Sequence, residues 1–162
     1  MATQELSPIE LVQNPAFGAV LLWHSAKAYQ TERIGELPQL PLLFLVLPIL
    51  YHGSTLVDVR STQLASGLSK FALKLGENRE RLFAVHDRAL LMRELSLQSV
   101  ATGISTGLLS LNYASAQVRA NDATPKAPPE RLRVHVSGAG KLGHWFARLP
   151  PSQVFSLLEV EV

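Results

Sequence analysis

Residues 37–51, LPQLPLLFLVLPILY, decide how the rest of the chain must fold. Every residue from Leu42 to Leu47 is large and apolar, and the stretch carries no charge. A membrane-spanning helix needs about 20 apolar residues, whereas Glu36 and Pro38 bound this run at its start and His52 follows its end. The run also lies too far along the chain, without a basic leader, to be a signal peptide. A helix that is apolar on all sides has to be covered on all sides, so we expect either a central core helix or a surface that another protein covers.

The composition favours a subunit that buries a large interface. Of the 162 residues, 47% are hydrophobic and 17% are charged, against about 25% charged in a typical soluble domain. The alternative is a compact apolar monomer. The length allows one domain with its own core, or one domain with a small appendage. Cysteine is absent, which excludes disulfides, zinc fingers and thiol catalysis and, without a targeting segment, predicts a cytoplasmic location.

Local signals predict a series of helices followed by a hairpin. The capping box Ser7-Pro8-Ile9-Glu10 predicts a helix start, and Asn14-Pro15 repeats that signal. Helical spacing predicts helices over about residues 15–30, 63–75 and 92–106, with Asn78 capping one between the last two. Pro48 should kink or break the apolar run. Residues 108–112 and 116–120 have the pattern of a β-hairpin. Among the side chains expected to point inward are Leu64, Phe83, Leu97 and Ile104.

The predicted fold class is mainly α: a winged-helix-like helical domain with a small β-hairpin and a short C-terminal strand-and-helix segment. Residues 1–120 form the helical core, and residues 121–131 form a polar, proline-rich linker. Residues 132–162 form a segment that packs on the core or on a partner. Within that segment we predict a strand over 132–136 and short helices over 141–148 and 152–158.

A glycine pattern, Gly138-Ala-Gly140-Lys-Leu-Gly143, resembles a phosphate-binding turn but lacks the necessary context. A mononucleotide-binding unit needs a crossover helix and further parallel strands, and the few remaining residues are interrupted by Pro150-Pro151. We therefore interpret the pattern as a glycine-rich turn between two short elements. The five histidines have no metal-ligand spacing, and no acid pair lies in an apolar segment. The sequence predicts no catalytic, cofactor or metal site, and no enzyme.

A DNA-binding function is the alternative that the winged-helix layout suggests. The helix that would enter the major groove, residues 88–106, has only Arg88 and Arg93 as bases. The remaining basic residues come earlier and are suited to phosphate contacts without sequence readout; they are Lys70, Lys74, Arg79 and Arg81. These residues could equally form a solvated face. We expect salt-sensitive, sequence-independent DNA affinity at most.

Several motifs together, in their order and spacing, resemble the small middle component of bacterial three-component ABC systems. The resemblance covers nearly the whole chain except the linker. The matching stretches are Asn14–Gly18, Leu21–Trp23, Pro41–Pro48, Ser54-Thr55, Leu108–Leu111, Lys141–Ala147 and Phe155–Leu158.

The resemblance implies a Lamassu-type assembly that defends bacteria against phage and plasmids. In such systems an ABC ATPase related to the structural-maintenance-of-chromosomes (SMC) proteins senses DNA, and a separate effector, often a nuclease, acts on the invader. The middle component is the non-catalytic adaptor between them. No membrane and no small-molecule substrate are implied. A winged-helix DNA-binding protein acting alone is the alternative, and an enzyme based on the glycine pattern ranks third.

The aromatic pair Trp145 and Phe146 is the most informative candidate for partner contact. The predicted helix around it is too short to be stable alone, so its aromatic rings must be buried either against residues 41–50 or in a partner. We expect Lys141 and Phe44 to belong to the same contact. If Trp145 is an interface anchor, its truncation should abolish partner binding without unfolding the chain.

Overall fold

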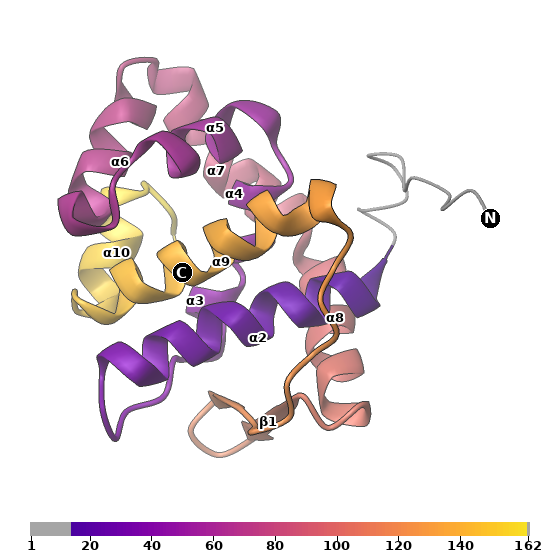
Figure 1. Ribbon diagram of the computed structural model, residues 1–162. Helices are drawn as coiled ribbons and strands as arrows, with labels where there is room; N and C mark the ends of the chain where they lie inside the picture. Colours follow the sequence, from indigo (N-terminus) through magenta and orange to yellow (C-terminus); the bar gives the residue numbers. More distant parts are fainter. Residues whose placement is uncertain (1–13, 162) are drawn as a thin grey trace.

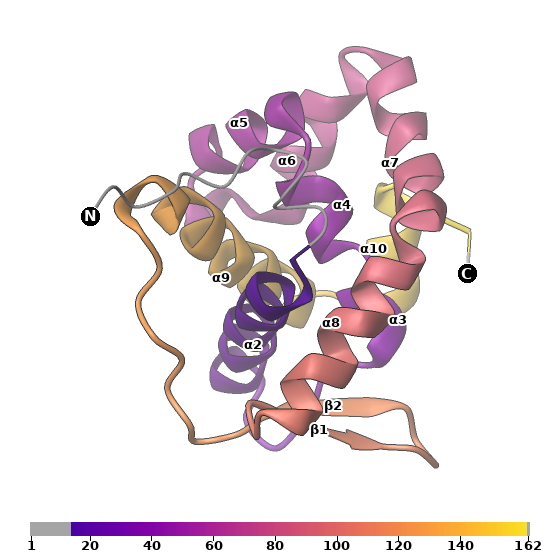
Figure 2. The same cartoon turned by 90° about the vertical axis from the view of Figure 1, so that its right-hand side faces the viewer.

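The computed structural model describes residues 14–161, so the capping box at Ser7–Glu10 lies outside the described residues. Helix α2 (Pro15–Glu32) starts where Asn14-Pro15 predicts, with the Asn14 side chain accepting a hydrogen bond from the Phe17 N–H at 3.1 Å. Its buried side chains occupy most of its circumference. The reason is visible in Figure 2, where α2 is seen nearly end-on between helices α9 (Arg133–Ala147) and α8 (Arg93–Ser105). Helix α2 is therefore the centre of the fold.

The apolar run forms the core beside α2, as two short helices, α3 (Leu40–Leu43) and α4 (Val46–Leu50). Leu42, Leu47 and Ile49 are fully buried. Pro48 has no N–H, and its ring conflicts with the carbonyl of the residue four positions earlier. That residue is Phe44, and the break between α3 and α4 falls there. The sequence allowed either a core position or a surface covered by another protein for this stretch, and the structure shows the core position.

A group of helices lies along one side of α9 and against α4 (Figure 1). It consists of α5 (Gly53–Ser61), a 3-10 turn (Leu64–Ser66), α6 (Gly67–Gly76) and α7 (Arg79–Leu91). The Asn78 side chain caps α7 by accepting from the Glu80 N–H at 3.0 Å, as predicted. Helix α8 follows α7 along one side of the molecule (Figure 2).

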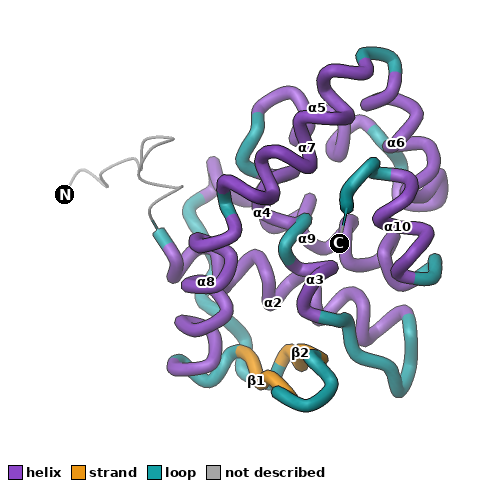
Figure 3. The backbone as a smooth tube through the Cα atoms, turned by 180° about the vertical axis from the view of Figure 1, so that it is seen from behind, coloured by secondary structure: helices purple, strands orange, loops and turns teal. Residues whose placement is uncertain are grey.

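The predicted hairpin is present as β1 (Leu109–Asn112) paired antiparallel with β2 (Gln117–Ala120). Figure 3 shows these two strands together at one end of the molecule. The hairpin is held against the rest of the chain, because Val118 N donates to Pro38 O at 3.0 Å and Ala120 N donates to the Gln30 side chain at 2.6 Å. The mainly α fold with a β-hairpin is confirmed. The winged-helix assignment stays a prediction.

The C-terminal segment differs from the prediction in two places. After β2, residues 121–129 run without regular structure to a 3-10 turn (Glu130–Leu132), and then α9 and α10 (Pro151–Leu157) follow. The strand predicted over 132–136 is wrong, because residues 133–136 are the first turn of α9. The glycine-rich turn is also wrong, because Gly138–Gly143 lies in the middle of that helix.

The last of the three α9 glycines, Gly143, is explained by the closeness of α2. The two helices run in the same direction, with Phe17 beside His135 near their starts and Glu32 paired with Arg148 near their ends. A methyl group at Gly143 would lie 2.0 Å from the carbonyl oxygen of Ser25. Only glycine fits there, so this residue permits the helix contact and is not part of a phosphate cradle.

Candidate functional site

The aromatic pair Trp145 and Phe146 lies in the chain's own core. Both side chains are 1% exposed or less. The Trp145 ring stacks on Phe71, with 5.7 Å between centroids, and its Nε1–H donates to the Leu64 carbonyl at 2.9 Å. A partner could reach these rings only by opening the core, so we assign partner contact to other residues.

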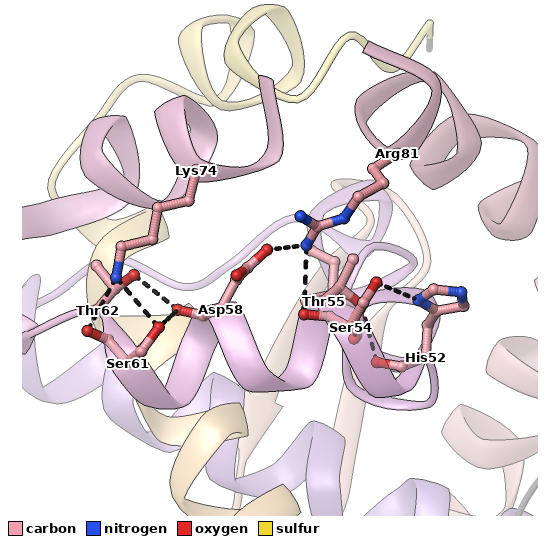
Figure 4. Close-up of polar contacts among 9 residues, drawn as sticks. His52, Ser54, Thr55, Asp58, Ser61, Thr62, Lys74 and Arg81 are labelled. Carbon is pink, nitrogen blue, oxygen red and sulfur yellow. Dashed lines mark hydrogen bonds and ion pairs between the residues drawn. The ribbon is translucent and has the colours of Figure 1, made fainter. Parts of the chain in front are cut away.

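Three of the predicted cationic residues, Lys74, Arg81 and Lys141, converge on one helix, α5. Figure 4 shows Lys74 and Arg81 reaching it from neighbouring helices. Lys74 Nζ donates to the Ser61 carbonyl at 2.9 Å and to the Ser61 hydroxyl at 3.1 Å. Lys141 Nζ lies 2.8–3.2 Å from the carbonyl oxygens of residues 59, 60 and 62. Carbonyl groups in the last turn of a helix carry the negative end of the helix dipole, and the Val59 carbonyl also accepts a backbone hydrogen bond from Thr62 N at 3.3 Å. The two lysines therefore stabilise the C-terminal end of α5.

Arg81 pairs with Asp58 in the middle of α5 and also donates to the Ser54 carbonyl at 3.4 Å (Figure 4). Beside it, the Ser54 hydroxyl and His52 Nδ1 are 3.1 Å apart. Burial, together with the positive charges of Arg88 and Arg81, lowers the pKa of His52. A nucleophilic serine would need its histidine oriented by a third group, such as a carboxylate. The carboxylate of Asp58 is instead paired with Arg81. We therefore interpret the contacts of His52, Ser54, Asp58 and Arg81 as structural ones that hold the first turns of α5.

The other predicted phosphate contacts, Lys70 and Arg79, are exposed. The structure thus splits the predicted set, since Lys74 and Arg81 are engaged on α5 while the other two point outward. Phe44 is half-buried and lines a cavity of about 290 Å³ together with His86, Leu90 and Phe155. Phe44 is therefore not brought together with Lys141.

Replacing Lys141 tests whether it acts as a helix cap. We expect Lys141→Met to lower the free energy of unfolding by about 1–2 kcal/mol, because the variant keeps the aliphatic stem but leaves three carbonyl oxygens without their charged donor. Urea unfolding followed by circular dichroism measures this change. Lys70→Met is the matched control, and its effect should stay within about 0.5 kcal/mol. Equal effects of the two substitutions would contradict the capping role.

Apolar side chains that were predicted to be inside are instead exposed on α7 and α8. Leu97 is 44% exposed, Phe83 is 53% exposed and Ile104 is 36% exposed; Leu64, in the preceding 3-10 turn, is also exposed. The inward side of α8 contains Ser96 and Ser99, whose hydroxyl groups are buried and have no hydrogen-bond partner. The small hydroxyl group lets α2 approach, since a methyl group at Gly18 would lie 2.1 Å from Ser99 Oγ. Sequence periodicity missed this orientation, because both sides of α8 contain apolar residues.

The outward side of the junction between α7 and α8 forms a shallow, open hollow of about 630 Å³. We call it the α7–α8 face; the residues that define it are Leu90, Leu91, Arg93, Glu94, Leu97, Gln98 and Ala101. Leu91, the most exposed of its leucines, is 83% exposed. Exposed apolar surface of this kind marks interaction sites.

Within residues 14–161, no group of three or more His, Asp and Glu side chains is arranged to hold a metal ion. No single helix in these residues is long and apolar enough to cross a membrane. The segments Leu40–Leu50 and Gly53–Ser61 have the necessary length and hydropathy only together, and they form a pair bent by 103°.

Comparison with known proteins found a match to one family model. The model, described as ABC-three component (ABC-3C) system Middle Component 3, matches residues 3–162. Neither the curated proteins nor the solved structures contain a match.

Proposed function

Because the chain belongs to the Middle Component 3 family of ABC-three component systems, we propose that it is a non-catalytic adaptor in bacterial defence. It joins an ABC ATPase related to the SMC proteins to an effector, often a nuclease, and the complex acts in the cytoplasm against phage and plasmid DNA. The identity of the partners and the defence role go beyond the family description and are the content of the proposal.

The observation that carries the proposal is the number of large apolar side chains on the outside of the chain. They occur on several elements, as an adaptor with two partners requires. Exposed apolar side chains that lie together, as Leu90, Leu91 and Leu97 do, are typical of interaction surfaces. The exposed large apolar side chains are Ile34, Val57, Leu64, Leu73, Phe83, Leu90, Leu91, Leu97, Ile104 and Tyr113.

Direct reading of DNA is less well supported. Of the two bases on the predicted reading helix, Arg88 donates through Nε to the Pro48 carbonyl at 3.1 Å, which leaves Arg93 outward. The exposed side of α8 carries a single basic residue, Arg93, next to the acidic Glu94, and its apolar side chains Leu97, Ala101 and Ile104 offer no hydrogen bonds to base edges. Any DNA contact through Lys70 and Arg79 would be to phosphates.

Co-expression with the other two components of its own system tests the adaptor role. We expect the chain to self-associate or to be poorly soluble alone, and to become monodisperse and co-purify when both components are present, because they cover its apolar surface. Size-exclusion chromatography with light scattering gives the masses. A chain that stays a soluble monomer at high concentration and binds neither component would overturn the proposal.

Protection of cells gives a second measurement. Bacteria that carry all three components should plate phage less efficiently than bacteria lacking the gene for this chain. Loss of protection with the ATPase and effector still expressed at normal levels would support an adaptor. Full protection without this chain would contradict that role.

A further inference from the structure

The α7–α8 face has a charge arrangement that matches itself. Arg93 and Glu94 are neighbours at its centre, with Leu90 and Leu91 on one side and Leu97 on the other. Both charged side chains are exposed. Within residues 14–161, no carboxylate lies within ion-pair distance of Arg93, and Glu94 has only a 3.5 Å contact from the Gln98 amide.

A twofold axis between residues 93 and 94 would pair the two charges of this centre. In an antiparallel contact between two identical helices, residues whose numbers add to a constant face each other, and each contact occurs twice. With the axis at this point, Arg93 of one copy faces Glu94 of the other. Leu90, in the last turn of α7, and Leu97, in α8, lie on opposite sides of this pair, so the same operation brings Leu90 of one copy toward Leu97 of the other. Two ion pairs would thus be flanked by two leucine contacts.

The orientation of α8 gives independent support for a covered face. Ser96 and Ser99 are buried with hydroxyl groups that make no hydrogen bond, while Leu97 between them points outward. Burying an unpaired hydroxyl group costs free energy, whereas burying a leucine side chain stabilises the folded chain. This orientation leaves Leu97 available for a contact on the outward side.

From these observations we infer that the chain forms a twofold-symmetric homodimer through the α7–α8 face. Its occupant is a second copy, held by reciprocal Arg93–Glu94 ion pairs and by reciprocal packing of Leu90 against Leu97. The inference does not depend on the adaptor role, because it concerns a contact that the chain makes with itself. Within a larger complex, the homodimer would present two copies of every other docking surface on the chain.

Charge reversal within the pair tests the symmetry directly. We expect the full chain to sediment at twice its mass of 17.7 kDa. Arg93→Glu alone and Glu94→Arg alone should each weaken dimerisation at least tenfold (about 1.4 kcal/mol or more), because each places like charges opposite one another. The double variant R93E/E94R restores both ion pairs in reversed order and should return dimerisation to the parent value. Such rescue within a single chain requires the two residues to meet across a twofold axis.

Controls separate this contact from general effects of charge and folding. Arg79→Glu changes the net charge by the same amount at an exposed position on α7, away from the α7–α8 face, and should leave the dimer intact. Leu97→Glu should give a folded monomer, with far-ultraviolet circular dichroism like that of the parent chain.

Three results would overturn the inference. The first is a parent chain that is a monomer, even if Arg93→Glu impairs its binding to another component. The second is a dimer that persists in Leu97→Glu. The third is a double variant that dissociates as readily as the single variants.

Discussion

Trp145→Ala should cost about 3–5 kcal/mol of the free energy of unfolding. The side chain is fully buried, stacks on Phe71 and donates a hydrogen bond to the Leu64 carbonyl. Its removal leaves a large cavity and a buried carbonyl without its donor. Since small domains are stable by about 5–15 kcal/mol in total, the variant loses much of its stability.

Trp145→Phe separates the two contributions. Phenylalanine keeps an aromatic ring beside Phe71 but cannot donate to Leu64, so we expect a smaller loss than for alanine. Urea unfolding followed by far-ultraviolet circular dichroism measures both variants. An unchanged unfolding midpoint for Trp145→Ala, together with loss of partner binding, would instead restore the docking role that the sequence first suggested.

Two glycines in α9 should respond to alanine in opposite directions. A methyl group at Gly143 would lie 2.0 Å from the carbonyl oxygen of Ser25, and that atom belongs to the backbone of α2. Gly143→Ala therefore forces α2 and α9 apart and should cost about 3 kcal/mol or more. A methyl group at Gly140 has nothing within 4 Å. Gly140→Ala should gain about 0.5–1 kcal/mol, because alanine favours the helix.

Since both substitutions add the same methyl group to the same helix, helix propensity cannot explain a difference in sign. Thermal and urea unfolding of the two variants gives the comparison. If Gly143→Ala were as stable as the parent chain, the close approach of α2 and α9 would be refuted.

The helix starts and the hairpin could be predicted because their signals are local. Asn14 and Asn78 each accept a hydrogen bond from a backbone N–H two or three residues later, so a few residues suffice to mark a helix start. Pro48 marked the break in the apolar run for the same reason, since its effect acts on the carbonyl four residues earlier. None of these signals requires knowledge of another part of the chain.

The errors arose where a distant segment decides the local structure. Val134 and Val136 alternate around His135 as in a strand, yet the surrounding sequence forms a helix because Leu142 and Trp145 face the core only at helical spacing. The glycine pattern resembled a turn because the reason for glycine at position 143 lies more than 100 residues earlier, at Ser25.

The candidate site was predictable only in part. Lys74, Arg81 and Lys141 are recognisable as basic residues, but no local signal shows that all three reach α5. The outward orientation of Leu97 was likewise hidden, because it depends on the space that Ser96 and Ser99 leave for α2.

The central pairing of α2 with α9 also has a consequence for how the protein is made. Helix α2 ends at Glu32 and α9 begins at Arg133. At translation rates of about 5–20 residues per second, α9 follows α2 from the ribosome after roughly 5–20 s. Throughout that interval the nascent chain has no partner for one side of its central helix, including the backbone at Ser25 that Gly143 later contacts. Chaperones that hold growing chains should therefore bind this protein during synthesis, and a transcript cut before α9 should yield a chain that proteases remove.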